Sequence, residues 1–288
     1  MSIPIVFMHY GDSEYLQYSL LQAKKSNKDS DIILIGDDSN NKYSFVKHAN
    51  INDSQSGQDF AKIYQHMSFN DYSYELFCIQ RWFMLRDFMA KHQISRCYHQ
   101  DSDVMLYEDI SMENVADFDF AFCGGISGGI AFINNFEALD GFCKFITAFY
   151  TVESLTEELK KIYQMVIKHV PNAGISDMIF INLYCNTRQH PEKIFDLSVI
   201  ENNAVFDLNV NLTNEYEQWH GRKKIYFTTN GVLCKNLLLN TFIKFKALHF
   251  QGEAKMFMKY FVQKTPEECI IPVTFDYSSC QWQEVHNL

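Results

Sequence analysis

The sequence predicts an α/β protein with a mixed, mostly parallel central sheet flanked by helices. The first observation behind this prediction is an apolar run at residues 3–8, a helical pattern at 15–21 and a second apolar run at 31–38. This spacing is typical of a right-handed strand–helix–strand unit. The second observation is composition, because 47% hydrophobic residues with 12 Gly and 5 Pro favour a compact fold without long linkers.

Polar residues follow both strands of this first unit. Residues 3–8 are expected to form a buried strand, and the helix after it has Ser13 as a candidate N-cap. Tyr10 follows the first strand, and Asp37 lies at the end of the second. Because ligands of such sheets bind beyond the carboxyl ends of the strands, Tyr10 and Asp37 are candidate ligand-binding residues.

The rest of the chain continues the alternation of helices and strands. Residues 40–60 are polar and are expected to form a loop. Amphipathic patterns predict helices at 74–91, 139–150, 155–169 and 176–184, and short apolar runs predict strands at 94–98, 119–123, 129–134, 224–228 and 247–250. No repeat or linker divides the chain, so we expect a single domain over 1–288. Its ligand-binding half is expected at about 1–110 and its second half at about 111–288.

Composition excludes several classes of protein. The formal net charge of −10 opposes binding to nucleic-acid phosphates. The eight cysteines show no zinc spacing and are expected to be reduced, mostly buried thiols. Neither a signal peptide nor a transmembrane helix is expected, so we expect a cytoplasmic protein. Peripheral contact with the inner face of a membrane stays open, and the sequence does not set the oligomeric state.

Asp101-Ser102-Asp103 follows the apolar run at 94–98. If that run is a strand, the two acidic side chains leave on the same side, because side chains alternate along a strand. Two carboxylates at this spacing suit Mn²⁺ or Mg²⁺, which can neutralise a diphosphate. Such a triplet is common in surface loops, so its meaning depends on the other motifs. The histidines outside the motifs, His9 among them, are expected to be structural or surface groups.

Four segments occur along the chain in a distinctive order. They are residues 81–85 on a helix that leads into 98–104, then 128–134, 176–182 and 249–255. This order resembles the GT-A (Rossmann-like) nucleotide-diphospho-sugar transferases, and most closely the glycogenin and galactosyltransferase-like family of retaining enzymes. That family shows an Arg-bearing helix, Asp-x-Asp, an Asn-x-Gly strand, an Asp-Gln-Asp helix and a late His-x-x-Gly-x-x-Lys. The resemblance covers roughly residues 3–258.

The resemblance implies a metal site made of Asp101, Asp103 and His249. Carboxylates mixed with imidazole are acceptable ligands for Mn²⁺. Gly252 would allow the backbone to approach the diphosphate closely. Lys255 would bind and stabilise the departing nucleoside diphosphate.

Further residues take donor-binding roles by the same resemblance. Arg81 and Asp177 join Lys255 as candidate catalytic residues. Arg81 would contact the diphosphate or the sugar. Asp177 would bind sugar hydroxyls or stabilise a cationic transition state, although an acid in the first turn of a helix also complements the helix dipole. Gly128 and Gly129 would face the donor sugar, but the Asn of the family pattern is absent here. Other donor-binding candidates are Ser102 between the two acids, Tyr10 for stacking on the nucleobase, and Asp37 for bonding base or ribose.

One departure from the family pattern precedes the acids. Family members carry an apolar strand directly before Asp-x-Asp, whereas His99 and Gln100 intervene here. Either the strand ends before His99, or these two side chains point at the site. The first interpretation is the simpler one.

These observations predict a metal-dependent glycosyltransferase. It would move a sugar from a nucleoside diphosphate, expected to be a UDP-hexose, to a hydroxyl of a glycan or lipid-linked glycan acceptor in surface glycan biosynthesis. The resemblance implies retention of anomeric configuration. One alternative is an inverting enzyme with Asp177 as the base. Another is a non-catalytic protein that binds a sugar nucleotide or glycan on the same fold. A phosphohydrolase is disfavoured, because its Asp-x-Asp would follow the first strand.

Overall fold

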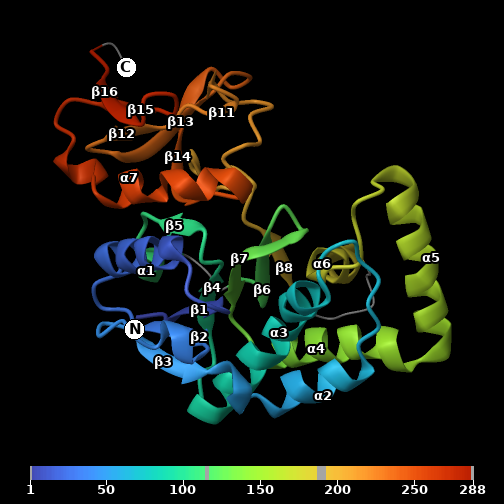
Figure 1. Cartoon of the computed structure of the whole chain (residues 1–288). Coiled ribbons are helices and arrows are strands. Elements are labelled where there is room, and N and C mark those ends of the chain that lie inside the picture. The colour runs from blue at the N-terminus through green and yellow to red at the C-terminus, as the bar shows by residue number, and fades with distance from the viewer. Residues whose placement is uncertain (1, 114–116, 187–192, 287–288) are drawn as a thin grey trace.

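The structure, a computed structural model, describes residues 2–113, 117–186 and 193–286. Figure 1 shows a large sheet flanked by helices, with a second, β-rich part stacked above it. The first part includes the N-terminus and the second part includes the C-terminus (Figure 1). The candidate ligand residues occur in both parts, so the way these parts meet determines the site.

The first sheet confirms the predicted mixed, mostly parallel architecture. Its strands are β3 (Lys47–Asn50), β2 (Ile32–Gly36), β1 (Ile5–His9), β4 (Cys97–Gln100), β7 (Ser127–Ile133), β6 (Phe120–Cys123) and β8 (Ile194–Asp196), in this spatial order. Within the described residues, each neighbouring pair in this sheet is parallel except the two pairs that involve β7. The carboxyl ends of β1 and β4 therefore meet at one edge, as the sequence predicts.

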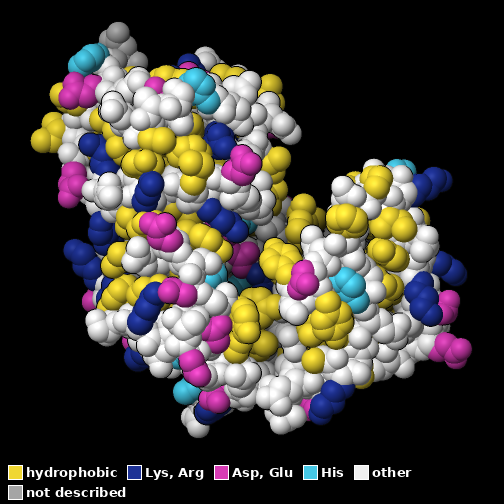
Figure 2. Space-filling model, viewed as in Figure 1, with side chains coloured by type: hydrophobic (Ala, Val, Ile, Leu, Met, Phe, Trp, Pro, Cys, Tyr) yellow, Lys and Arg dark blue, Asp and Glu magenta, His cyan; other side chains and the backbone are white. Residues whose placement is uncertain are grey.

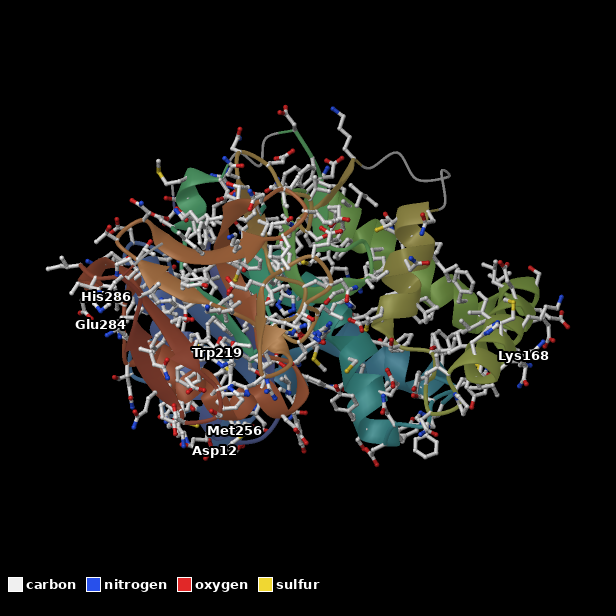
Figure 3. The ribbon with its side chains drawn as sticks, turned by 90° about the horizontal axis from the view of Figure 1, so that it is seen from above. Asp12, Lys168, Trp219, Met256, Glu284 and His286 are labelled. Carbon is white, nitrogen blue, oxygen red and sulfur yellow. The ribbon has the colours of Figure 1, made fainter. Side chains whose placement is uncertain are left out.

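Helices cover both faces of this sheet. They are α1 (Glu14–Ser26), α2 (Gln55–Ile63), α3 (Tyr72–His92), α4 (Phe136–Thr151), α5 (Glu153–His169) and α6 (Asp177–Asn186). Alternate residues of β1 point to opposite faces: Phe7 packs with α1, whereas Val6 packs with α3, α4 and α6. Seen from above in Figure 3, α5 with Lys168 projects away from the β-rich part that carries Glu284 and His286.

The second sheet belongs to the β-rich part. Its strands are β16 (Gln281–Glu284), β15 (Val273–Asp276), β12 (Tyr226–Thr228), β13 (Gly231–Asn236), β14 (Thr241–His249) and β5 (Val104–Leu106), with β9 (Ala204–Phe206) also paired to β14. Strands β10 (Gln218–Trp219) and β11 (Arg222–Lys223) form a separate hairpin, and α7 (Met258–Val262) packs against α1. The antiparallel pairing of β5 with β14 sets His249 opposite Val104, directly after the acidic triplet.

Short 3₁₀ helices complete the chain. They are η1 (Asp38–Asn40), η2 (Ile51–Asp53), η3 (Ile110–Met112), η4 (Gly252–Phe257) and η5 (Pro266–Glu268). The most relevant is η4, because it follows His249 and contains Lys255. Among the described residues, no helix is both long and apolar enough to cross a membrane.

Two predictions of local structure are wrong. Residues 40–60 are not a loop, because they contain β3, an edge strand, and most of α2, a short helix that buries Gly57 and Phe60. The strand before the acids does not end before His99, since β4 extends through Gln100. The other predicted helices and strands are present with shifted ends, and Ser13 precedes α1 without a side-chain capping bond. All eight cysteines are free and five are buried, as expected.

Candidate functional site

The acidic triplet forms a turn that both sheets hold in place. The Asp101 N–H donates to the Gly129 carbonyl of β7 at 2.8 Å, which ties the turn to the first sheet. The Asp103 carbonyl accepts the N–H of Phe250, just after β14, also at 2.8 Å. This double attachment fixes the turn where the two parts of the chain meet.

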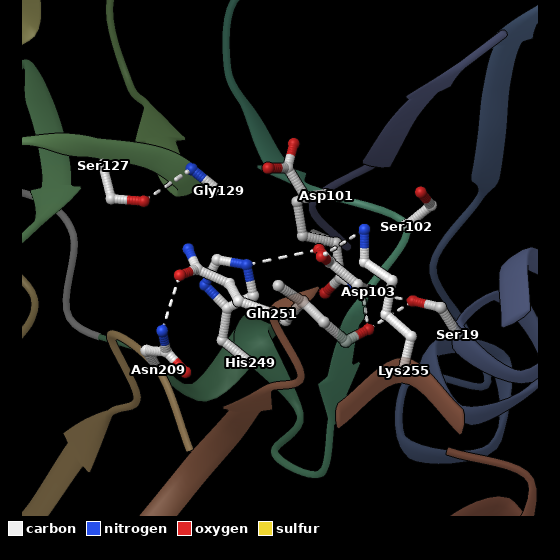
Figure 4. A network of polar contacts seen from close by, with 12 residues as sticks. Ser19, Asp101, Ser102, Asp103, Ser127, Gly129, Asn209, His249, Gln251 and Lys255 are labelled. Carbon is white, nitrogen blue, oxygen red and sulfur yellow. Dashed lines mark hydrogen bonds and ion pairs between the residues drawn. The ribbon is translucent and has the colours of Figure 1, made fainter. Parts of the chain in front are cut away.

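Asp101, Asp103 and His249 converge at this turn. Each offers one ligand atom, and the three atoms lie within 4.8 Å of one another. The His249 Nε2 lies 3.2 Å from Asp103 Oδ1, and the Lys255 Nζ lies 3.2 Å from Asp103 Oδ2 (Figure 4). Two carboxylates and one imidazole are suitable ligands for Mn²⁺ or Mg²⁺. The residues that the sequence predicts as metal ligands therefore form a cluster that fits a divalent cation.

The charges of this cluster stabilise one another. Burial raises the pKa of a carboxyl, but the charges and hydrogen bonds of His249 and Lys255 outweigh burial and hold the pKa of Asp103 at about 2. Burial lowers the pKa of His249, and the charge and hydrogen bond of Asp103 overcome this effect, so the net pKa is raised. The pKa of Lys255 is raised by the same balance. The site is thus arranged to keep Asp103 ionised.

Arg81 connects the cluster to helix α6. Its Nη1 donates to Asp101 Oδ1 at 2.5 Å, while its Nε and Nη2 donate to Asp177 Oδ2 at 3.0 and 2.5 Å. Burial lowers the pKa of this guanidinium, but the charges of the two carboxylates outweigh burial, so the net pKa is raised. The structure thus brings Arg81 to the acids and gives it two carboxylate partners.

Asp177 faces Arg81 in the interior of the protein. Besides the two bonds from Arg81, its Oδ2 accepts the indole N–H of Trp82 at 3.1 Å. The side chain is buried and does not line the pocket described below. These contacts fix the orientation of Arg81. They do not show a carboxylate that is free to reach a substrate.

A cavity of about 700 Å³ extends from the acids along β1 and α3. Figure 2 shows a hollow at the middle of this face, with charged side chains in its depth. Its lining includes these site residues: Tyr10, Arg81, Asp101, Ser102, Asp103 and Lys255. Helix α3 adds Tyr74, Phe77 and Cys78. The cavity is large enough for a small organic ligand.

The glycines of β7 allow close approach of the site residues. A Cβ on Gly129 would lie 2.7 Å from His249 Cε1 and 3.2 Å from Asp101 Oδ2. A Cβ on Gly128 would lie 2.4 Å from the Trp82 ring. Gly252 has φ +62°, a backbone conformation that favours glycine, at the start of η4. None of these three residues lines the cavity. Gly128 and Gly129 allow close packing, whereas Gly252 has open space around it and supplies the positive φ of its turn.

Tyr10 and Asp37 have different environments. Tyr10 is 68% exposed at the edge of the cavity, with its ring centroid 6.4 Å from that of Phe77. The carboxylate of Asp37 accepts the N–H of Gly11 at 2.6 Å and the N–H of Ser39 at 2.8 Å. It does not line the cavity and caps the turn after β1. Of this pair, the structure places Tyr10 at the site and Asp37 behind it.

Sequence reasoning missed His9 and disfavoured His99, two histidines that lie close to the acidic turn. His9 lines the cavity at the end of β1, and its Nδ1 lies 2.9 Å from Ser102 Oγ. Its position at the carboxyl end of a parallel strand could have indicated that His9 lies at a ligand site, because ligands of such sheets bind there. His99, within β4, bonds the Val6 carbonyl through Nδ1, and its Nε2 lies 3.9 Å from Asp101 Oδ1. Burial, aided by the charge of Arg81, lowers the pKa of His99 to about 4, so a neutral ring lies behind Asp101.

No protein-family model matches the chain, and no curated protein sequence matches it. Solved structures with a similar arrangement are glycosyltransferases. The galactosyltransferase LgtC, solved with donor and acceptor sugar analogues, shares 11% identity over 93% of this chain and 99% of that chain, with a TM-score of 0.48. Mouse xyloside xylosyltransferase 1 in its apo form shares 13% identity over 71% of this chain and 88% of that chain, with a TM-score of 0.47.

A third similar structure is a glycosyltransferase involved in the glycosylation of the major capsid of PBCV-1. It shares 9% identity over 90% of this chain and 100% of that chain, with a TM-score of 0.44.

Proposed function

We propose that this chain is a metal-dependent GT-A glycosyltransferase that moves a sugar from a nucleoside diphosphate to an acceptor hydroxyl. One observation carries the proposal: Asp101, Asp103 and His249 converge beside Lys255 at one end of a cavity of about 700 Å³. A diphosphate needs several positive charges around it, and a cation site next to a half-buried lysine can provide them.

The cation would be Mn²⁺ or Mg²⁺, held by Asp101, Asp103 and His249. When bound, it would neutralise the diphosphate and help it to leave. Asp101 keeps its orientation through the bond from Arg81 Nη1. Ser102 lies between the acids with its hydroxyl against His9, so it can bond a phosphate oxygen at the same place.

Lys255 supplies the second positive charge. Its Nζ lies 3.2 Å from Asp103 Oδ2 and 4.9 Å from the centre of the Tyr15 ring, which together hold the side chain toward the acids. When the bond between the sugar and the diphosphate breaks, negative charge grows on the departing oxygen. A fixed ammonium group near that oxygen lowers the barrier, because it interacts more strongly with the transition state than with the donor.

The nucleoside would occupy the cavity away from the acids. Tyr10 and Phe77 offer aromatic surface at its edge, and a base can stack there. We propose a UDP-hexose as the donor, as the sequence resemblance implies. Gly128 and Gly129 would support the site by allowing close packing of the residues that hold the donor, and Gly252 by giving the backbone a positive φ before Lys255.

We propose that the anomeric configuration is retained. An inverting enzyme needs a carboxylate that is free to activate the acceptor. The Asp177 carboxylate is buried and accepts hydrogen bonds from Arg81 and Trp82, so its environment does not favour that role. We propose a glycan or lipid-linked glycan as the acceptor, within surface glycan synthesis in the cytoplasm or at the inner face of a membrane.

A panel of nucleotide sugars tests the proposal. The protein is incubated with Mn²⁺ and each donor, and free UDP or GDP is measured. Release from one donor, abolished by EDTA and by Asp103→Ala, is expected. Asp31→Ala is the matched control, because this exposed carboxylate pairs with Lys47 outside the site. The proposal is wrong if no donor is cleaved and no nucleotide binds in a metal-dependent way. Binding without release, even with an acceptor mixture, would indicate a non-catalytic binding protein.

A further inference from the structure

A buried ion pair lies behind the histidine of the candidate metal site. Lys223 and Asp207 are 4% and 2% exposed, and the Lys223 Nζ lies 2.8 Å from Asp207 Oδ1. The Lys223 ammonium lies 5.4 Å from the centre of the Tyr216 ring and 5.8 Å from that of Phe245. Two charges withdrawn from water are costly unless they are paired, and removal of one partner leaves an uncompensated buried charge.

Asp207 binds the backbone of His249 directly. Its Oδ2 accepts the N–H of His249 at 3.1 Å, while its Oδ1 receives the ammonium of Lys223. The carbonyl of His249 accepts the N–H of Val210 at 2.9 Å. Both polar groups of the His249 backbone are therefore held by the segment that begins at Asp207.

The same segment also fixes the residue two positions further on. The Asn209 side chain donates to Gln251 Oε1 at 2.6 Å, and Asn211 donates to the Gln251 carbonyl at 3.1 Å. Lys223 joins this arrangement, because its Nζ also donates to the Asn209 carbonyl at 2.6 Å. Figure 4 shows Asn209, Gln251 and His249 next to one another, to the left of Asp103.

His249 needs such support because it is the last residue of β14. Beyond this point only the bond from the Phe250 N–H to the Asp103 carbonyl continues the pairing, and Gly252 follows with a positive φ. A metal ligand must keep its position to within a few tenths of an ångström, and groups that orient a ligand strongly affect the affinity of the site.

We propose that the Asp207–Lys223 ion pair positions His249 for cation binding. This inference rests on the proposed metal site. Asp207 and Lys223 are positioning residues, since they act through the backbone of His249 and contact neither the cation nor the donor. Without the lysine, Asp207 becomes an uncompensated buried charge that moves toward water and releases the His249 N–H.

Mn²⁺ binding to the full-length, metal-free protein tests the inference. Free Mn²⁺ is measured by electron paramagnetic resonance during titration of the wild type, Lys223→Met and Asp207→Asn. The Mn²⁺ dissociation constant is expected to rise at least ~10-fold in Lys223→Met. Asp207→Asn keeps an oxygen for the His249 N–H but loses the charge that holds Lys223, so a smaller rise is expected. Lys224→Met is the matched control, because this neighbouring lysine pairs with half-buried Glu217 away from the site. The Mn²⁺ dissociation constant of this variant should stay within about twofold of the wild-type value.

A double variant separates positioning from general stabilisation. Lys223→Met with Asp207→Leu removes both charges, and such apolar replacement often restores the stability of a protein. If the pair positions His249, the melting temperature recovers in the double variant while Mn²⁺ binding stays weak. The inference is wrong if the single variants bind Mn²⁺ as the wild type does, or if the double variant recovers both properties. Absence of Mn²⁺ binding in the wild type would overturn the metal site itself and the inference with it.

Discussion

The Nε2 of His249 lies 3.2 Å from Oδ1 of Asp103, although the two residues belong to distant segments of the chain. The pairing of β14 with β5 produces this contact. The candidate site therefore exists only where the β-rich part meets the first sheet. Since the His249 Nε2 that faces Asp103 would be the ligand atom, a cation that binds here competes with a proton on His249.

Cation binding should therefore depend on pH. Asp103 raises the pKa of His249 above its ordinary value, so the ring is protonated at a higher pH than a free histidine. A protonated imidazole cannot ligate a metal, and Mn²⁺ affinity should rise as the pH increases from about 6 to about 8. Calorimetry in two buffers of different ionisation enthalpy should show the release of a proton on binding. A dissociation constant that does not change over this range would exclude His249 as a ligand.

Lys255 should contribute to turnover more than to cation binding. Replacing it with Met removes the ammonium next to Asp103 but leaves the three ligand atoms in place. We expect kcat to fall by roughly 10²–10³-fold, as for the loss of one group that stabilises a developing negative charge. Mn²⁺ affinity should be unchanged or slightly higher, because a nearby positive charge is gone.

The matched control for Lys255 is Lys259→Met, which removes an exposed lysine of α7. Its kinetics should equal those of the wild type. Equal kcat values for Lys255→Met and the wild type would contradict the leaving-group role of Lys255.

Gly129→Ala should weaken the site without unfolding the protein. The new Cβ would lie 2.7 Å from His249 Cε1, closer than real contacts allow, so the imidazole must move. We expect Mn²⁺ affinity to fall by roughly 10-fold, as for other changes that disturb ligand orientation.

Gly125→Ala controls for the cost of a side chain at a glycine position. Gly125 has φ +60°, and a Cβ there meets nothing within 4 Å. This variant should lose stability through backbone strain and yet bind Mn²⁺ normally. If Gly125→Ala and Gly129→Ala lose the same Mn²⁺ affinity, the effect is not specific to His249.

Arg81 should be essential for stability as well as for the site. Arg81→Met leaves the buried Asp177 carboxylate without its cation, and loss of one partner of a buried pair costs about 3–5 kcal/mol. Arg86→Met on the same helix breaks a more exposed pair with Asp140 and should cost about 0–1 kcal/mol. Urea unfolding of both variants measures the difference. Equal free energies of unfolding for Arg81→Met and Arg86→Met would mean that the Arg81–Asp177 contact does not stabilise the fold.

The sequence predicts the first half of the fold better than the second. Residues 3–38 form one local strand–helix–strand unit, and its hydrophobic pattern is unambiguous. The second sheet consists of short antiparallel strands with distant partners, such as β5 and β14. Even so, β13 shows an alternating pattern in which Val232 and Cys234 are buried, and this signal was missed.

The cluster of Asp101, Asp103 and His249 could be proposed from the sequence because its residue types and order match a known pattern. The side chains that orient them could not. Asp207 contacts His249 only because a segment without a sequence signature comes next to the 249–255 motif in the β-rich part. Asp37 was predicted at the site because it ends a strand, but its carboxylate is used by the backbone of Gly11. Competition between such local bonds and a ligand is not visible in a sequence.

Anomalous X-ray scattering from crystals grown with Mn²⁺ and UDP would test the central claim directly. A manganese peak should lie about 2.2 Å from a carboxylate oxygen of Asp101 and of Asp103 and from the Nε2 of His249, with a diphosphate oxygen completing its ligands. The uracil should lie in the cavity near Tyr10. A structure in which UDP is bound while the manganese peak is absent, or lies away from these three residues, would contradict the proposed site.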